Sequence, residues 1–253
     1  MSRADAAYRR RYVDGLAALW GVPAARLGVT GSSVAPVAAR RGQRLVSLYR
    51  VGPHSVLVTD PDLSDRFDSW HGRPGVVAFG EFEAWASARG ATRLGRGFDH
   101  VPATGWSAPE RPAAVVDLDG SAPATIGLVG ALLEDCPPAD RDEAEFDLAA
   151  LDPVLVGWVA GGRLTALAGG RPEPARPGCH DIGVIVHPAG RRRGRAQAVV
   201  AAVTERLVAA GELPLYRYGA TNVGSGRLCS AVGFEMVAEL EAFEWPAPGG
   251  TDG

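Results

Sequence analysis

The chain has 253 residues, of which 46% are hydrophobic, and its formal net charge is −3. This length and composition are typical of a globular protein with one large or two smaller domains, and the charge gives no general attraction for nucleic acid. No apolar run approaches the ~20 residues that cross a bilayer, and residues 1–11 lack the apolar segment of a secretory leader. The cysteines, Cys136, Cys179 and Cys229, are too widely spaced for a metal site and suit a reducing compartment. We therefore expect a cytoplasmic protein that needs no metal and has neither nucleic acid nor a membrane as partner.

The first hundred residues predict an α/β module. Its elements come from helical spacing of apolar residues and from β-prone runs that flank a Gly-Pro turn. They are a helix at about 4–20, a hairpin of strands 45–49 and 55–59, and helices at about 62–70 and 80–89. The proline-bearing segment 102–112 indicates a linker, which places a domain boundary near residue 108.

The remainder predicts a second domain, residues 109–246, in which helices alternate with antiparallel strands. The strands are expected at 114–118, 155–160, 164–168, 181–186, 215–220 and 235–245, the helices at about 123–134, 139–150 and 225–232 and after residue 194, and a loop at 169–178. This order is typical of the α/β class with a mixed sheet, of the α+β kind. Residues 247–253 are expected to form a disordered tail.

A basic turn joins the strand at 181–186 to the helix after residue 194. It reads Val186-His187-Pro188-Ala189-Gly190-Arg191-Arg192-Arg193-Gly194-Arg195-Ala196. The unpaired N–H groups and the macrodipole of a helix N-terminus attract anions, and the turn therefore suits a diphosphate. The alternative is a basic helix start that binds nothing, or a patch for nucleic acid, although no aromatic residues interleave the arginines.

A second motif lies closer to the C-terminus, with Asn222, Ser225 and Leu228 three residues apart and Gly233-Phe234 following. Together the two motifs resemble those of the GNAT superfamily of acyl-CoA-dependent N-acetyltransferases. That family's pyrophosphate signature, Arg or Gln, two residues, Gly, one residue, then Gly or Ala, is matched by Arg191, Gly194 and Ala196. Its second signature, an Asn followed by a helix that ends in Gly-Phe, is matched as well. The resemblance covers about residues 111–245 and implies a GNAT-like fold there.

The resemblance implies acetyl-CoA as cosubstrate, with no metal. In the family the strand before the turn diverges from its neighbour and pairs with the pantetheine arm through backbone atoms, and a backbone N–H near Val186 would polarise the thioester carbonyl. The residues expected to bind the cosubstrate are Val184, Ile185, Val186, Arg191, Arg192, Arg193, Gly194, Arg195, Ala196, Asn222 and Ser225.

Three residues are candidates for the chemistry of transfer. Many family members place a base near the start of the strand at 181–186, which here means His180 or Asp181. Because neighbouring residues of a strand face opposite sides, at most one of them should point into the cleft. The position at which many members have a proton-donating Tyr is Cys229, either a replacement general acid or a buried apolar thiol. For each of the three residues, the alternative is a purely structural role without part in catalysis.

The function that these residues predict is transfer of an acetyl group from acetyl-CoA to a primary amine of a small molecule or peptide, by direct attack in a ternary complex. Seven carboxylates between Glu134 and Asp147 favour a cationic acceptor, unless they simply form a solvated acidic helix. The missing Tyr favours a different class, a non-catalytic acyl-CoA-binding regulator. The N-terminal module would either cap the acceptor side or be a degenerate second copy of the fold, and a homodimer is an option.

Overall fold

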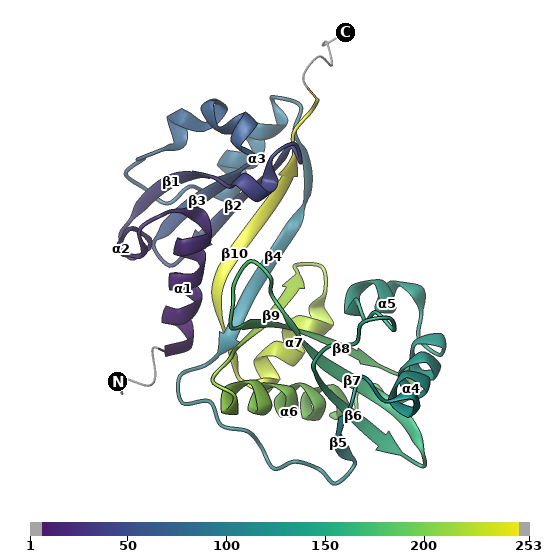
Figure 1. The fold of residues 1–253 in the computed structure, drawn as a ribbon. Coiled ribbons are helices and arrows are strands. Elements are labelled where there is room, and N and C mark those ends of the chain that lie inside the picture. The colour runs from purple at the N-terminus through teal and green to yellow at the C-terminus, as the bar shows by residue number, and fades with distance from the viewer. Residues whose placement is uncertain (1–6, 248–253) are drawn as a thin grey trace. The chain divides into compact units, whose positions relative to one another are not determined.

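The computed structural model describes residues 7–247, and they form two compact units (Figure 1). The N-terminal unit combines Arg9–Asp99 with Tyr218–Val223 and residues 236–247. The C-terminal unit combines His100–Arg217 with Gly224–Glu235 and residues 7 and 8. The units therefore do not follow the expected division at residue 108, because the last strand of the chain belongs mainly with the N-terminal unit. The predicted tail lies, except for residue 247, outside the described residues.

The N-terminal unit holds a sheet with strand order β1-β3-β2-β10-β4. Its elements are α1 (Ala7–Trp20), α2 (Ala24–Leu27), β1 (Gly31–Pro36), η1 (Ala38–Arg40), β2 (Leu45–Val51), β3 (His54–Thr59), η2 (Pro61–Trp70), α3 (Phe79–Ser87), β4 (Thr92–Pro102) and the long β10 (Phe234–Glu244). The hairpin of β2 and β3 is confirmed, with Leu48 opposite Leu57. Aromatic side chains, among them Phe67, Phe82 and Trp245, fill the core against this sheet.

The strand β4 was not expected from the sequence, because charge rather than apolar alternation marks it. Within the N-terminal unit, Arg93 Nη2 lies 2.8 Å from Glu241 Oε1 and Arg96 Nε lies 2.8 Å from Glu239 Oε1, both on β10. These pairs join two neighbouring strands through their side chains. The expected α-helix at 62–70 is instead a 3₁₀ helix, which begins where Asp60 accepts a hydrogen bond from the Asp62 N–H.

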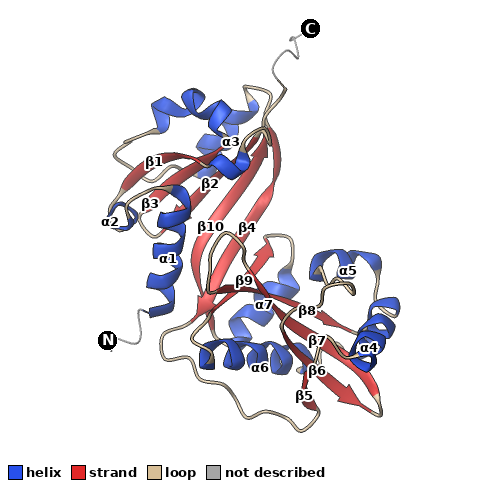
Figure 2. Ribbon diagram, in the orientation of Figure 1, coloured by secondary structure: helices blue, strands red, loops and turns tan. Residues whose placement is uncertain are grey.

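The C-terminal unit contains the sheet order β9-β8-β7-β6-β5 (Figure 2). Its elements are β5 (Val115–Leu118), α4 (Pro123–Glu134), α5 (Pro138–Ala144), β6 (Val154–Ala160), β7 (Arg163–Pro172), β8 (Cys179–Val186), η3 (Pro188–Gly190), α6 (Arg195–Ala209), β9 (Leu213–Gly219) and α7 (Val223–Val232). The pairs β5–β6, β6–β7 and β7–β8 are antiparallel, whereas the pair β8–β9 is parallel. The expected mixed α/β fold class is confirmed.

Helices cover both faces of this second sheet. A side chain at Gly170 would meet Leu207 and Val203 of α6, whereas one at Gly169 would meet Phe146 in the segment after α5. Because neighbouring residues of a strand point to opposite faces, α6 covers one face of the sheet. The other, here called the α5 face, is covered by α5 and by the residues that follow it up to Asp152, here called the α5 segment. The same two glycines explain why β7 continues to Pro172, through what the sequence predicts as a loop: they are small enough for both layers to approach closely.

The acidic helix is shorter than expected, because α5 ends at Ala144 rather than near residue 150. Glu145 follows in the left-handed conformation, with a φ of 54°. Its carbonyl oxygen accepts a 3.3 Å hydrogen bond from Arg171 of β7, and its carboxylate lies 3.0 Å from the same guanidinium. Within residues 7–247, no helix is long and apolar enough to cross a membrane.

Candidate acyl-CoA site

The strands β8 and β9 separate soon after they begin. They pair at three positions, from Cys179 opposite Leu213 to Asp181 opposite Leu215. Beyond Asp181, β8 stays paired with β7 as far as Val186, but it has no recorded pairing with β9 among the described residues. The β9-facing edge of Val184, Ile185 and Val186 is therefore not engaged by a strand, which is the geometry that backbone pairing with a pantetheine arm requires.

The basic turn leads from this edge to the N-terminus of α6. Gly194 is the N-cap, in the left-handed conformation with a φ of 73°, and no side chain caps the helix. An added Cβ at Gly194 would meet no heavy atom within 4 Å, so the space beside the first turn is open. The first intrahelical bond runs from the Ala198 N–H to the Gly194 carbonyl, which leaves the N–H groups of Arg195, Ala196 and Gln197 without intrahelical partners. These features fit a diphosphate.

The four arginines of the turn have different surroundings. Arg191 forms an ion pair with Asp140 of α5 and donates a 3.3 Å hydrogen bond from Nε to the Val186 carbonyl, so it ties the turn to its neighbours. Arg195 lies over the Trp158 ring, 5.7 Å from its centroid, and Gly190 gives its guanidinium room. Arg192 and Arg193 are exposed and have no recorded ion pair within the described part of the chain. They are the cations that remain available to an anion.

The second motif is divided between the compact units. Asn222 belongs to the N-terminal unit, where its N–H donates a 2.9 Å hydrogen bond to the Gly219 carbonyl. Ser225 and Cys229 lie on the part of α7 in the C-terminal unit. Ser225 hydrogen-bonds to the buried Tyr216 of β9, and burial raises the pKa of that phenol. The predicted contacts of Asn222 and Ser225 with the cosubstrate stay predictions.

Cys229 is fully buried, and burial raises the pKa of its thiol to about 12. A CoA thiolate has the ordinary pKa of a thiol, ~8.5. Proton transfer from Cys229 to that thiolate would therefore be uphill by about 5 kcal/mol. The structure favours the interpretation of Cys229 as an apolar core residue over that of a general acid.

His180 and Asp181 face opposite sides of the sheet. A side chain at Gly183 would meet the Ala144 carbonyl 2.9 Å away, so Asp181, two residues earlier, shares the α5 face. His180 faces the α6 side, with Nδ1 3.2 Å from the Gly170 carbonyl oxygen and Nε2 3.9 Å from Glu212 Oε2. Asp181 Oδ2 lies 2.7 Å from Arg217 Nη2, while its Oδ1 is buried without a hydrogen-bond partner in residues 7–247. Each of the two predicted bases is therefore already engaged by a neighbour.

A further ionisable group, Asp152, lies on the same face as Asp181 and was missed by the sequence analysis. Its Oδ2 lies against Gly169, where any Cβ would collide with it. Burial raises the pKa of this carboxyl to about 6, against the opposing charge of Arg171, and the charge of Asp181 adds to the rise. Asp152 has no recorded hydrogen bond or ion pair within the described residues. The sequence signal that could have found it is the Gly169-Gly170 pair inside a strand, which indicates a close approach from another segment.

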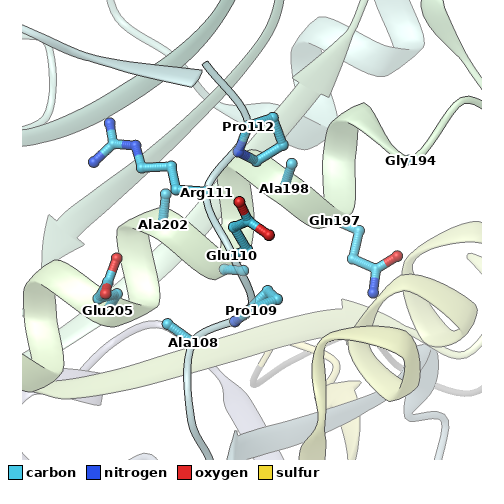
Figure 3. A pocket seen from close by; sticks show the side chains of 11 residues that line it. Ala108, Pro109, Glu110, Arg111, Pro112, Gly194, Gln197, Ala198, Ala202 and Glu205 are labelled. Carbon is cyan, nitrogen blue, oxygen red and sulfur yellow. The ribbon is translucent and has the colours of Figure 1, made fainter. Parts of the chain in front are cut away.

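Two hollows lie near the candidate site, one beside the N-terminus of α6 and one beside Asp152. Figure 3 shows the smaller, about 170 Å³, where residues 108–112 of the predicted linker cross α6 beside Gly194, Gln197 and Ala198. The larger is an open depression of about 610 Å³ with Asp117, Asp119, Asp152 and Arg206 in its wall. Among the described residues, no group of three or more His, Cys, Asp or Glu side chains could hold a metal ion.

Residues 156–245 match the family model described as FR47-like protein, a GNAT-related family. This segment contains both predicted motifs, so the match confirms the resemblance over this part of the chain and supports an acyltransferase. None of the curated proteins matches the sequence.

Several solved structures are similar to the chain. A GNAT-family acetyltransferase from Novosphingobium aromaticivorans is 21% identical with a TM-score of 0.44, over 62% of this chain and 69% of that one. A GNAT-family acetyltransferase from Colwellia psychrerythraea is 18% identical with a TM-score of 0.48, over 73% and 70%. An aminoglycoside N-acetyltransferase in complex with CoA is 20% identical with a TM-score of 0.37, over 49% of this chain and 92% of that one.

Proposed function

We propose that the chain transfers an acetyl group from acetyl-CoA to a primary amine of a small molecule or peptide. The observation that carries this proposal is the separation of β8 from β9 directly before an uncapped helix N-terminus. The open strand edge suits the amide groups of pantetheine, and the turn suits the diphosphate. Both features lie within the C-terminal unit and within the FR47-like segment.

The reaction is direct attack in a ternary complex. The free amine attacks the thioester carbonyl, a C–N bond forms, the C–S bond breaks and CoA leaves as a thiolate. All three cysteines are buried, and burial raises the pKa of each thiol, which supports a route in which no cysteine carries the acyl group or protonates the thiolate. The three free, buried cysteines also support the proposal of a cytoplasmic location.

The alternative function is an acyl-CoA-binding regulator without turnover, which the Cys at the position of the family's Tyr favours. The two functions are separated by mixing the protein with acetyl-CoA and a panel of primary amines and measuring free CoA thiol. We expect thiol release that depends on the amine. Binding of CoA without release across the panel would support the regulator instead.

The site is tested by Gly194→Asp, which puts negative charge and a side chain where phosphate should meet backbone N–H groups. The added Cβ meets no atom, but the positive φ at Gly194 strains any side chain, so Gly194→Asn is the matched control for strain. We expect CoA to raise the Tm of the parent and of Gly194→Asn. In Gly194→Asp, most of this CoA-dependent rise in Tm should be lost. Equal CoA protection in all three would contradict the assignment of the turn.

A further inference from the structure

The segment between α5 and β6 lies directly on the sheet at two glycines of neighbouring strands. Gly169 of β7 is opposite Gly183 of β8 in the register. A Cβ on the first would collide with Asp152 and come within 2.9 Å of Phe146 Cε1, and a Cβ on the second would come within 2.9 Å of the Ala144 carbonyl oxygen. This close approach fixes Asp152 on the α5 face, the face that Asp181 shares.

Asp152 differs from Asp181 and Glu145 on this face in having no recorded hydrogen bond or ion pair within residues 7–247. Asp181 is paired with Arg217, and Glu145 with Arg171. The charged groups that act on Asp152 are Arg171 of β7 and Asp181 and His180 of β8. Arg171 and Arg217 are already paired with Glu145 and Asp181, so a proton can neutralise Asp152 without breaking any ion pair recorded in the described residues.

Asp152 also lines the open depression of about 610 Å³. A general base must receive a proton from the substrate and then return it to solvent in each turnover. The open depression gives Asp152 a route to solvent. Its contact with Gly169, which is opposite Gly183 of β8, places it beside the strand whose edge is open from Val184 onward.

We propose that Asp152 is the general base that accepts the proton of the acceptor amine. This inference rests on the proposed acyl transfer. One Asp152 oxygen takes a proton from the acceptor ammonium, which leaves a neutral amine and a carboxylic acid. The amine nitrogen then forms the C–N bond as the C–S bond breaks, the amide nitrogen loses its second proton, and one proton ends on the CoA thiolate while the other returns to solvent from Asp152.

The test is Asp152→Asn, which keeps the shape of the side chain and removes the base. With whichever panel amine the parent acetylates, kcat/KM should fall by about 10²-fold to 10⁴-fold near neutral pH. The parent should show an acid limb with an apparent pKa near 6, matching the Asp152 carboxyl, and the variant should lack it. The matched control is Asp68→Asn, the same chemical change at an exposed carboxylate of η2 in the N-terminal unit, which should change neither quantity.

Thermal unfolding gives a readout that does not need activity. Because the folded protein raises the pKa of Asp152 above its unfolded value, ionisation of this group opposes folding once the pH exceeds ~4. Asp152→Asn should therefore raise the Tm at pH 7.5, and this gain should disappear near pH 4. A variant that is more stable and less active would identify a carboxylate kept for chemistry.

Other results would overturn the proposal. A loss of less than tenfold with the acid limb intact would show that Asp152 is not the base, even if the Tm rises as expected. If the acid limb of the pH profile disappears in Asp181→Asn but not in Asp152→Asn, Asp181 is the general base. If no amine in the panel releases CoA thiol from the parent enzyme, the proposed function fails first, and this inference fails with it.

Discussion

At the scale of single residues, Asp152, which we propose as the general base, has no recorded hydrogen bond or ion pair within residues 7–247. Asp152 precedes a proline at the start of a strand, and nothing in its immediate sequence sets it apart from other loop aspartates. It becomes a candidate only when the chain brings it against Gly169 and near Asp181. His180 and Asp181 were identifiable because the family motif fixes their position on the strand, whereas the environment of a loop residue depends on tertiary packing.

For Cys229, the position in the sequence and the environment in the structure disagree. It occupies the position of the family's proton-donating Tyr, but it is fully buried. We expect Cys229→Ser to keep most of the turnover and to lower the free energy of unfolding by about 1–3 kcal/mol, because a hydroxyl without a partner replaces a buried apolar thiol. Chemical denaturation and CoA-thiol release measure the two effects separately. Cys229→Ala, which adds no polar group, is the control. A collapse of turnover in both variants at unchanged stability would instead identify the thiol as the general acid.

At the scale of elements, the helices and strands with clear periodicity were predictable, and those held by side-chain charge or by close approach were not. The strand β4 carries arginines that pair with glutamates on β10, so its apolar pattern is weak. The 169–178 segment reads as a loop because of its glycines, yet those glycines continue β7 beneath the α5 segment. In both cases the partner that explains the element is far away in the sequence.

The turn between β8 and α6 gives a prediction at this scale. Arg191 holds the turn to α5 through Asp140, and an exposed ion pair of this kind contributes at most about 1 kcal/mol. We expect Asp140→Asn, which keeps the cation but removes its partner, to weaken CoA binding by up to about fivefold through a less ordered turn. Arg191→Ala should weaken it further, because the hydrogen bond to Val186 is lost too. Calorimetric titration with CoA measures both.

The opposite sign for Asp140→Asn would be equally informative. Tighter CoA binding in this variant would show that Asp140 competes with phosphate for Arg191 rather than orienting it. Asp142→Asn is a suitable control, since it removes a carboxylate from the same helix, α5, that has no recorded partner among residues 7–247.

At the scale of the whole molecule, the sequence predicts the fold class but not how the chain is divided between its units. A boundary drawn at a proline-rich linker assumes that each unit is one continuous stretch. Here residues 218–223 and 236–247 join the N-terminal unit, although all but the last two of them lie within the 156–245 segment that matches the FR47-like family model. The apolar pattern of β10 indicates a strand but not which distant strand it pairs with, and that partner is β2.

We propose that the acceptor is a cationic amine, because residues 134–147, here called the acidic segment, contain seven carboxylates. Three of its seven carboxylates are matched by arginines: Asp135 by Arg163, Asp140 by Arg191 and Glu145 by Arg171. Glu134, Asp142 and Asp147 have no recorded ion pair within the described residues. The attraction for a cation is therefore weaker than the sequence alone indicates, but its sign is unchanged.

We expect kcat/KM for a polyamine acceptor to fall as ionic strength rises from ~0.01 M to ~0.15 M, because the Debye length shrinks from ~30 Å to ~8 Å. An amine that is neutral at the assay pH should show no such trend. Combining Glu134→Gln, Asp142→Asn and Asp147→Asn should flatten the salt dependence for the polyamine, whereas a control with three exposed carboxylates neutralised elsewhere, Asp65→Asn, Asp68→Asn and Glu205→Gln, should leave it steep. Long-range attraction acts on encounter rather than on the chemical step, so kcat should change little in either set. An equal salt response for charged and neutral acceptors, or an equal flattening in both triple variants, would show that the acidic segment is only a solvated surface and would remove the argument for a cationic acceptor.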